Sequence, residues 1–279
     1  VQVTKPEGSA EDLAYVKDLL GSFTTSFSTS SADRSKNVNS GAKHVNGTVL
    51  YPGETFSMYE TVAPFTAENG YAMAGSYLNG EVVDSMGGGI CQVSTTLYNA
   101  VLRAELEVVE RSPHSMTVHY VELSEDAAIA GTYKDFKFKN STEYPIYIEG
   151  YTTSDKKITF NIYGKETRDS NRSISFESVL VNEVKPNTIL RDDAGQGLGY
   201  KSVSAGKTGY VAELYKIVKV NGVETDRIKV NKSTYKGTNR VVTYGTAGDP
   251  TLSENLRAAI AAQDEALADA NIAAAVPAQ

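Results

Sequence analysis

The sequence predicts an α+β domain with antiparallel strands and a helix that carries the single cysteine, followed by a small all-β module and a C-terminal helix. Two observations predict this fold class. Residues 90–106 place apolar side chains at helical spacing, whereas short alternating runs before and after them are typical of strands. Beyond about residue 170, strand-like runs follow one another without a helix until residue 252. A helix segregated from antiparallel strands is typical of the α+β class.

The chain of 279 residues has room for more than one domain, and we divide it into four parts. Residues 1–22 are interpreted as the remnant of an upstream domain or linker, with a short helix over 11–20 that ends at Gly21. Residues 23–167 form the main domain, 168–248 the β module, and 249–279 a C-terminal helix with a disordered tail. Because the chain starts at Val1, we expect a fragment or a processed form. A signal peptide or membrane anchor upstream of Val1 is compatible with this expectation.

The elements of the main domain follow from turn residues and periodicity. A helix is expected over 33–45, capped by Asp33, and a second over 90–106. Strands are expected at 48–51, 81–84, 107–110, 115–121, 136–138, 144–151 and 157–162. In the β module, strands are expected at 173–184, 201–204, 209–220, 224–231 and 240–243. A helix over 252–270, capped by Ser253, and disorder over 271–279 complete the prediction.

Charge and composition exclude several classes. The net charge is −7 with no basic stripe, which argues against a nucleic-acid partner. No apolar run reaches the roughly 20 residues that a transmembrane helix needs, so this chain contains no predicted membrane span. We expect no metal and no other cofactor, because His114 and His119 face opposite sides of the predicted strand and cannot join Cys91 on one zinc ion.

Cys91 is the predicted chemical centre. It follows three glycines and starts a predicted helix, where free amides and the helix dipole favour a thiolate. An oxyanion formed by attack of this thiolate would be bound by neighbouring groups. The candidates for oxyanion or substrate binding are Gly88, Gly89, Gln92 and Ser94. The alternative is a buried, inert thiol, as free cysteines often are.

A thiolate nucleophile usually needs a base, and His114 is the best candidate among three histidines. Alternation along 114–121 puts His114 on the apolar face expected to pack on the Cys91 helix. The alternative is a hydrogen-bonded histidine at a strand end. We interpret His44 as a surface residue and His119 as solvated or structural.

The group that orients His114 stays open at this point. Asp84, Asp126 and Asp135 are candidates, and Arg111 is a candidate for binding a substrate carboxylate through two hydrogen bonds. A residue of each of these four kinds is more often an ordinary surface or ion-pair residue.

Several strings resemble the VanW domain family over about residues 24–165. They are NGTVLYPGETFS at 46–57, GGGICQVSTTLYNA at 87–100, ERSPHS at 110–115 and DFKFKN at 135–140. The β module resembles the G-five domain, an extracellular module often appended to cell-wall enzymes. In relatives a peptidoglycan-binding-like domain often precedes the VanW domain, which would explain residues 1–22. The family takes its name from its association with vancomycin-type glycopeptide-resistance clusters.

The resemblance implies an extracytoplasmic protein of the cell surface or wall of a bacterium, expected to be Gram-positive. It also implies a peptidoglycan L,D-transpeptidase that cross-links stem peptides through a Cys91 thioester, with His114 as base. The expected partners are the stem peptides and the glycan. Two other functions stay open: a non-catalytic wall-binding protein, and a cysteine peptidase or carboxypeptidase of the wall.

Overall fold

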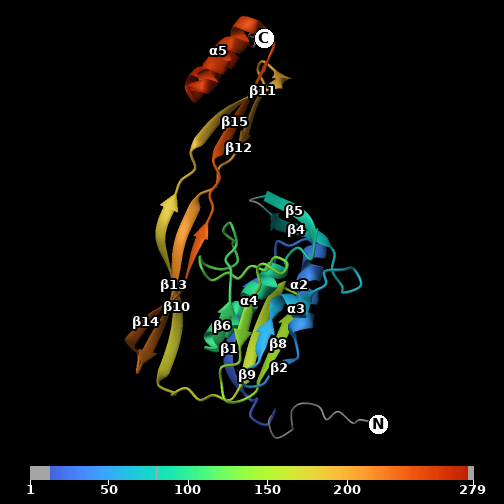
Figure 1. Cartoon of the computed structure of the whole chain (residues 1–279), viewed down its shortest axis with the longest axis vertical. Coiled ribbons are helices and arrows are strands. Elements are labelled where there is room, and N and C mark those ends of the chain that lie inside the picture. The colour runs from blue at the N-terminus through green and yellow to red at the C-terminus, as the bar shows by residue number, and fades with distance from the viewer. Residues whose placement is uncertain (1–12, 79–80, 276–279) are drawn as a thin grey trace. The chain divides into compact units, whose positions relative to one another are not determined.

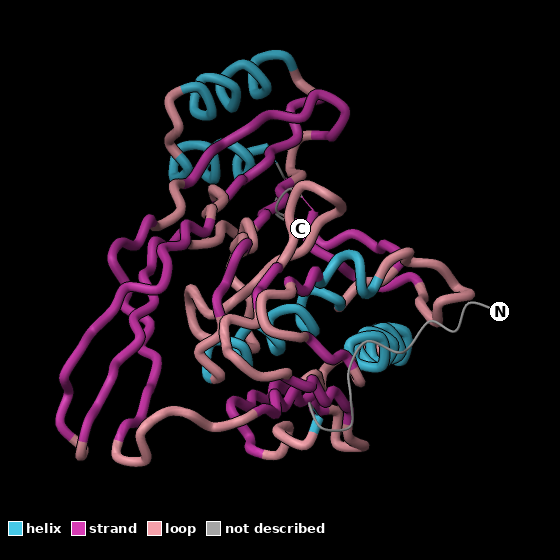
Figure 2. Tube along the Cα trace, turned by 60° about the horizontal axis from the view of Figure 1, so that its bottom comes forward, coloured by secondary structure: helices cyan, strands magenta, loops and turns pink. Residues whose placement is uncertain are grey.

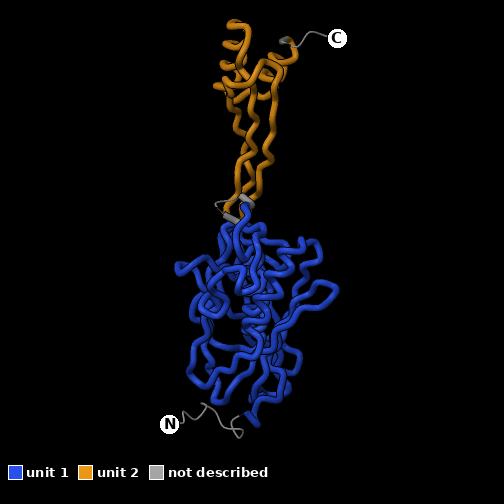
Figure 3. The backbone as a smooth tube through the Cα atoms, turned by 90° about the vertical axis from the view of Figure 1, so that its right-hand side faces the viewer, with its two compact units in different colours: residues 1–181, 211–235 blue, residues 182–210, 236–279 orange. Residues whose placement is uncertain are grey.

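The structure is a computed structural model that describes residues 13–78 and 81–275. The chain is mostly β with a few helices, and two helices follow its last strand (Figure 2). It divides into two compact units, one comprising the chain up to Val181 together with Val211–Tyr235, the other Asn182–Tyr210 with the chain from Lys236 (Figure 3). Residues 168–248, predicted as one module, contribute to both units. Among the described residues, no helix is long and apolar enough to cross a membrane.

The first unit is built on a four-stranded antiparallel sheet with the order β1-β9-β8-β2 (Figure 1). Its strands are β1 (Asp18–Ser26), β9 (Lys157–Gly164), β8 (Ile146–Thr152) and β2 (Thr48–Leu50). Helix α4 (Ile90–Arg103) packs on β1 and β9, and helix α2 (Ala32–Val45) packs on β8 and on α4. Isoleucine and phenylalanine side chains of β8 and β9 are fully buried beneath these helices. The apolar core therefore holds α4 rigidly against the sheet.

The helix predicted over 11–20 does not extend to residue 20: Leu13 is helical, residues 14–17 form turns, and strand β1 begins at Asp18. Residues 11–12 lie outside the described part, and from Asp18 the chain pairs with β9. Gly21 is not a helix stop: a Cβ added to it would lie 2.4 Å from the backbone N of Ala104. Close approach of β1 to α4 thus requires glycine here, and pairing with a neighbouring strand overrides the local helical pattern.

The remaining elements of the first unit surround α4. They are β3 (Thr55–Ser57), α3 (Met58–Val62), β4 (Met73–Leu78), β5 (Glu81–Met86), β6 (Glu107–Glu110) and β7 (Lys137–Lys139). Strands β3, β7 and β6 form one small sheet, and β4 and β5 form a hairpin. The predicted helix over 33–45 and the strand over 107–110 are confirmed, although Ser31, not Asp33, caps α2.

The strand predicted over 115–121 is wrong. No strand is assigned between Arg111 and Phe136, and this segment runs as an irregular chain. Hydrogen bonds to side chains take the place of a ladder: the backbone N of His114 donates to Asp126, and that of Ala127 donates to Thr95. Such bonds offer the backbone an alternative to pairing.

Two further sheets follow. The first has the order β10-β13-β14, from β10 (Arg172–Val184), β13 (Gly209–Val220) and β14 (Val223–Tyr235). The second has the order β11-β15-β12, from β11 (Thr188–Gly197), β15 (Arg240–Ala247) and β12 (Lys201–Ser204), with β11 and β15 parallel. Strand β11 was not predicted, because its second half is rich in aspartate and glycine.

The predicted C-terminal helix is two helices, α5 (Pro250–Ala261) and α6 (Glu265–Ala275). Asp249, not Ser253, caps α5, and its carboxylate accepts bonds from the amides of Thr251 and Leu252. The chain turns at Gln263, which has a φ of 56°. Residues 271–275, predicted to be disordered, belong to α6, and the rest of the predicted tail lies outside the described residues.

Candidate functional site

Cys91 occupies the first turn of α4, directly after the three glycines. Gly87 and Gly89 adopt positive φ values of 82° and 110°, a region that other residues rarely adopt. Gly88 is needed for a different reason, because a Cβ added to it would lie 2.2 Å from the carbonyl oxygen of Ala74 in β4. The triple glycine therefore lets the chain pass tightly beneath the β4-β5 hairpin and enter the helix at the cysteine.

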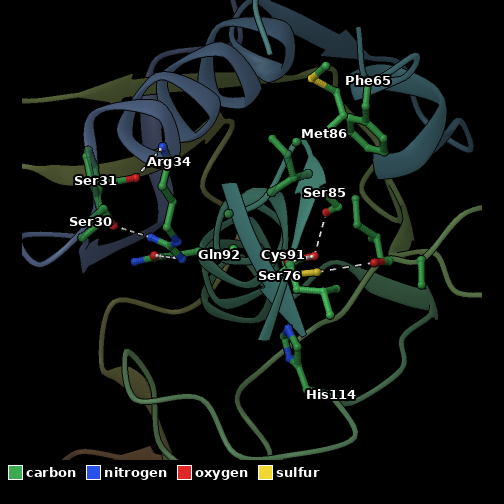
Figure 4. A pocket seen from close by; sticks show the side chains of 18 of the residues that line it. Ser30, Ser31, Arg34, Phe65, Ser76, Ser85, Met86, Cys91, Gln92 and His114 are labelled. Carbon is green, nitrogen blue, oxygen red and sulfur yellow. Dashed lines mark hydrogen bonds between the residues drawn. The ribbon is translucent and has the colours of Figure 1, made fainter. Parts of the chain in front are cut away.

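The thiol faces a cavity of about 550 Å³ within the first unit (Figure 4). Cys91 is half-buried, and its Sγ donates a hydrogen bond to the carbonyl oxygen of Ile129 at 3.4 Å. His114 lines the same cavity, and in Figure 4 its ring points toward the sulfur. The sulfur is thus held in place while it remains open to a ligand in the cavity.

Two polar residues on α4 hold the irregular segment near Asp126 against the helix. Thr95 and Asn99 follow Cys91 at intervals of four residues and so share its helix face. The amide of Ala127 donates to Thr95 Oγ1 at 3.0 Å, and Asn99 Nδ2 donates to the carbonyl oxygen of Glu125 at 2.7 Å. These bonds fasten the irregular segment along the helix and bring Asp126 into the site.

Asp126 positions His114. Its Oδ2 accepts hydrogen bonds from the backbone N of His114 and from its ring Nδ1, both at 2.7 Å. Because Nδ1 is used in this way, Nε2 is the ring nitrogen left to interact with the thiol of Cys91. The structure therefore brings cysteine, histidine and aspartate together in one chain of hydrogen-bonding groups.

Asp126 is itself fully buried and has further partners. Its Oδ1 accepts from Arg111 Nη2 at 3.0 Å and from the hydroxyl of Tyr235, at the end of β14. The same hydroxyl accepts a bond from the amide of Ser124 at 2.7 Å. Tyr235 of strand β14 thus helps to hold the Asp126 carboxylate in place.

The three titratable groups shift one another's pKa. Burial raises the pKa of the Cys91 thiol, but the hydrogen bond and positive charge of His114 outweigh burial, so the net pKa is lowered. Burial lowers the pKa of His114, yet its bonds to Asp126 and Cys91 raise it to about 9. Burial raises the pKa of Asp126, and His114 and Arg111 reverse this, leaving it lowered. These directions favour a thiolate beside an imidazolium.

The residues predicted to bind substrate or oxyanion around the thiol differ in their burial and in whether they line the cavity. Gly88 is buried, and its amide donates to the carbonyl oxygen of Ser85. Ser94 is fully buried and does not line the cavity. Gln92 lines the cavity, but its side chain is used by Thr25, Ser26 and Arg34. Gly89 lines the cavity.

The other candidates are placed away from the cavity. The guanidinium of Arg111 is occupied by Asp126, Ser124 and Ser233, so it holds the aspartate and is not free for a substrate carboxylate. Asp84 is exposed on β5 and does not line the cavity, because its neighbours on the strand face inward. Asp135 bonds to Ser57 and the amide of Tyr59.

The other two histidines, His44 and His119, are exposed. His44 is exposed, and its ring stacks on Tyr71. His119 is exposed at the cavity and makes an edge contact with Tyr120. In the described part of the chain, no group of three or more His, Cys, Asp and Glu residues could hold a metal ion.

The sequence did not single out several residues that line the cavity. Arg34 enters it from α2, Phe65 follows α3, and Ser76 and Met86 come from the β4-β5 hairpin. All four are distant from the glycine-rich string. The row formed by Cys91, Thr95 and Asn99 was a usable signal for the loop at Asp126, since polar residues at four-residue spacing on a buried helix need partners.

Fold and site together define a mostly β protein whose first unit presents a Cys–His–Asp arrangement to a cavity. Comparison with known proteins identifies two domains in the chain. Residues 33–163 match the family model described as VanW like protein, and residues 177–247 match the G5 domain. The chain therefore carries a VanW-like domain followed by a G5 domain.

Two curated relatives match about half of this chain. The uncharacterized protein YoaR of Bacillus subtilis (strain 168) is 40% identical over 144 residues, covering 51% of this chain and 48% of YoaR. The vancomycin B-type resistance protein VanW of Enterococcus faecalis (strain ATCC 700802 / V583) is 31% identical over 134 residues, covering 46% of this chain and 48% of the relative. The chain thus spans about half the length of these relatives.

Two solved structures are similar to just over a quarter of this chain. The G5 domain of IgA1 protease is 23% identical with a TM-score of 0.23, covering 28% of this chain and 94% of that domain. The G5 domain of HP0197 is 23% identical with a TM-score of 0.18, covering 27% of this chain and 100% of that chain.

Proposed function

We propose that this chain is a cysteine acyltransferase of bacterial peptidoglycan, an L,D-transpeptidase that cross-links stem peptides outside the cytoplasm. The observation that carries the proposal is the arrangement of Cys91, His114 and Asp126 beside a cavity. A VanW-like domain joined to a G5 domain supports association with the cell wall. The relative named as a vancomycin resistance protein supports the same setting.

The first step forms a thioester. The thiolate of Cys91 attacks the carbonyl carbon of the third stem residue, a C–S bond forms, and the C–N bond to the terminal D-alanine breaks. The leaving amine takes the proton that His114 carries as imidazolium. Asp126 keeps the ring oriented throughout, through its bond to Nδ1.

The second step transfers the acyl group. An amine of a neighbouring stem peptide attacks the thioester carbon and gives its proton to His114. A C–N bond forms, the C–S bond breaks, and the thiolate is regenerated. Water in place of the amine would give a carboxypeptidase, so the nature of the acceptor separates these two reactions.

The oxyanion of each tetrahedral intermediate needs donors near the thiol. Among the glycine-loop amides, those of Gly87, Gly88 and Ile90 already donate to backbone carbonyl oxygens. We assign the oxyanion to the amides of Gly89 and Cys91, which start α4 at its positive end. Gly88, a predicted oxyanion donor, has no such role in this proposal.

A non-catalytic wall-binding protein is the second candidate, favoured by the G5 domain match over residues 177–247. In the primary proposal, this module places the first unit on the glycan and contributes no chemistry. The two functions differ in whether Cys91 is required.

The test incubates purified chain with stem tetrapeptides that carry lysine or diaminopimelate at the third position, followed by mass spectrometry of the products. We expect cross-linked dimers and free D-alanine from the wild type and none from Cys91→Ala or His114→Ala. His44→Ala is the matched control and should retain activity. Dimers formed by Cys91→Ala would end the proposal. Sedimentation with insoluble peptidoglycan that is independent of Cys91, without any product, would establish the binding function instead.

A further inference from the structure

The described lining of the cavity beside Cys91 carries one permanent positive charge. Among the described residues that line it, Arg34 is the only arginine or lysine, and none is Asp or Glu. The guanidinium donates to two neutral oxygens, Ser30 Oγ and Gln92 Oε1, the latter at 2.9 Å. Arg111, by contrast, is neutralised by Asp126. Arg34 therefore brings an uncompensated charge to the ligand side of the site.

The guanidinium of Arg34 is held in a fixed orientation. Gln92, which accepts from Arg34, is itself fixed by its bonds to Thr25 Oγ1 at 3.0 Å and to the carbonyl oxygen of Ser26 at 2.9 Å. Gly89 packs closely on the aliphatic part of the Arg34 side chain, since a Cβ added to Gly89 would lie 3.0 Å from Arg34 Cγ. A preorganised guanidinium loses little entropy when it binds a planar carboxylate.

The opposite side of the cavity is chemically different. In Figure 4, Arg34 lies on one side of Cys91, and the side chains of Phe65 and Met86 lie on another. Ser76 and Ser85 bond to each other beside the thiol at 2.6 Å. A ligand that fills this cavity would therefore place an anionic end near Arg34 and a less polar part beyond the sulfur.

We infer that Arg34 binds the terminal carboxylate of the donor, so that the substrate class is a peptide with a free α-carboxylate on the residue that leaves. This inference rests on the proposed function for the identity of the donor peptide. It deepens that function by making the reaction exo-acting: one residue is released from a free C-terminus, and peptides continued or blocked at that end are excluded. The carboxylate role predicted for Arg111 thus passes to Arg34.

The test measures binding in a Cys91→Ser background, in which no thioester forms. The probes are a stem tetrapeptide with a free C-terminus and the same peptide as its carboxamide, titrated by calorimetry. Since a hydrogen bond to a charged group is worth roughly 1.5 to 3 kcal/mol, we expect the free acid to bind about ten- to a hundredfold more tightly than the amide. Adding Arg34→Gln should abolish this difference, and Arg34→Lys should restore part of it.

Arg227→Gln is the matched control, because it removes the same charge from an exposed residue that does not line the cavity. It should leave the preference for the free acid unchanged. Equal binding of acid and amide, no binding of either, or a preference that survives Arg34→Gln would overturn the inference. If Arg34→Gln fails to fold, the peptide pair still tests the preference for a free carboxylate, and Arg34→Lys tests whether Arg34 is the residue that binds it. A clear preference without any turnover by the wild type would overturn only the proposed chemistry.

Discussion

Asp126 holds His114 at two points: its Oδ2 lies 2.7 Å from the backbone N and 2.7 Å from the ring Nδ1 of the same histidine. One buried carboxylate thereby fixes both where the residue sits and how its ring is turned. A strand would fix only the backbone. This arrangement explains how an irregular segment can present a well-defined imidazole to Cys91.

Replacing Asp126 tests this support through stability. Asp126→Asn leaves Arg111 and His114 buried without a counter-charge, and we expect the free energy of unfolding to fall by about 3 to 5 kcal/mol. Urea denaturation at pH 7 measures this loss. Asp84→Asn, on an exposed carboxylate, should change stability by less than about 0.5 kcal/mol.

The difference in stability between the wild type and Asp126→Asn should depend on pH. The pKa of Asp126 is lowered in the folded state from an ordinary value of 3.8. Its stabilising contribution is therefore complete above that value and is lost as the pH falls through the lower, folded pKa. The stability difference between wild type and Asp126→Asn should shrink on acidification below about pH 4. A difference that grows there would contradict this assignment.

Alkylation of Cys91 by iodoacetamide reports the state of the thiol. The wild-type rate should rise with pH at an inflection below the 9.0 of an ordinary thiol. In His114→Ala the bond to Ile129 still lowers the thiol pKa, but burial, the largest influence, and the charge of Asp126 raise it, so the inflection should move upward. At pH 7 we expect alkylation to slow by about tenfold or more. An unchanged pH profile would show that His114 does not lower the pKa of the Cys91 thiol.

Tyr235 is predicted to act as a positioning residue. Its hydroxyl joins Asp126 to the amide of Ser124, and Tyr235→Phe removes both bonds. We expect a loss of about 1 to 3 kcal/mol in unfolding free energy. Because Asp126 would be less well held, the alkylation profile of Cys91 should also shift upward. Tyr215→Phe, whose hydroxyl donates to Glu213 away from the cavity, should leave that profile unchanged.

Gly88 is predicted to be required for steric reasons alone. In Gly88→Ala the new Cβ would meet the carbonyl group of Ala74, and we expect a cost of about 1 to 3 kcal/mol and slower alkylation of Cys91. Gly197→Ala is the control, because its Cβ would lie 3.9 Å from the nearest described atom outside its chain neighbours. Thermal unfolding of both variants checks the difference.

The local parts of this structure were predictable from the sequence. Three glycines before a helical pattern place Cys91 at the start of α4, because the necessary backbone angles and the apolar spacing are properties of adjacent residues. Strands β8 and β9 follow in the same way from their alternation. The prediction of a strand at 115–121 failed because side-chain partners hold both ends of the segment: Asp126 binds the amide of His114, and Thr95 of α4 binds the amide of Ala127.

Long-range pairing also explains the functional residues that the sequence did not indicate. Arg34 lies in a helix that reads as an ordinary surface helix, and only the folded chain brings it to the cavity beside Gln92. Arg111 looked available for a ligand, yet Asp126 and Ser233 occupy it. Charge alone does not reveal which arginine has a partner, since the partner comes from a distant segment.

The central claim is that Cys91 carries the acyl group, and intact-protein mass spectrometry tests it most directly. The chain is mixed with a donor tetrapeptide that has a free C-terminus, quenched in acid within the first turnover, and weighed. We predict a mass increase equal to the mass of the donor minus the mass of the released D-alanine, mapped to Cys91 by digestion and absent from Cys91→Ala. Turnover of the donor with no adduct, or with an adduct on another residue, would contradict the account.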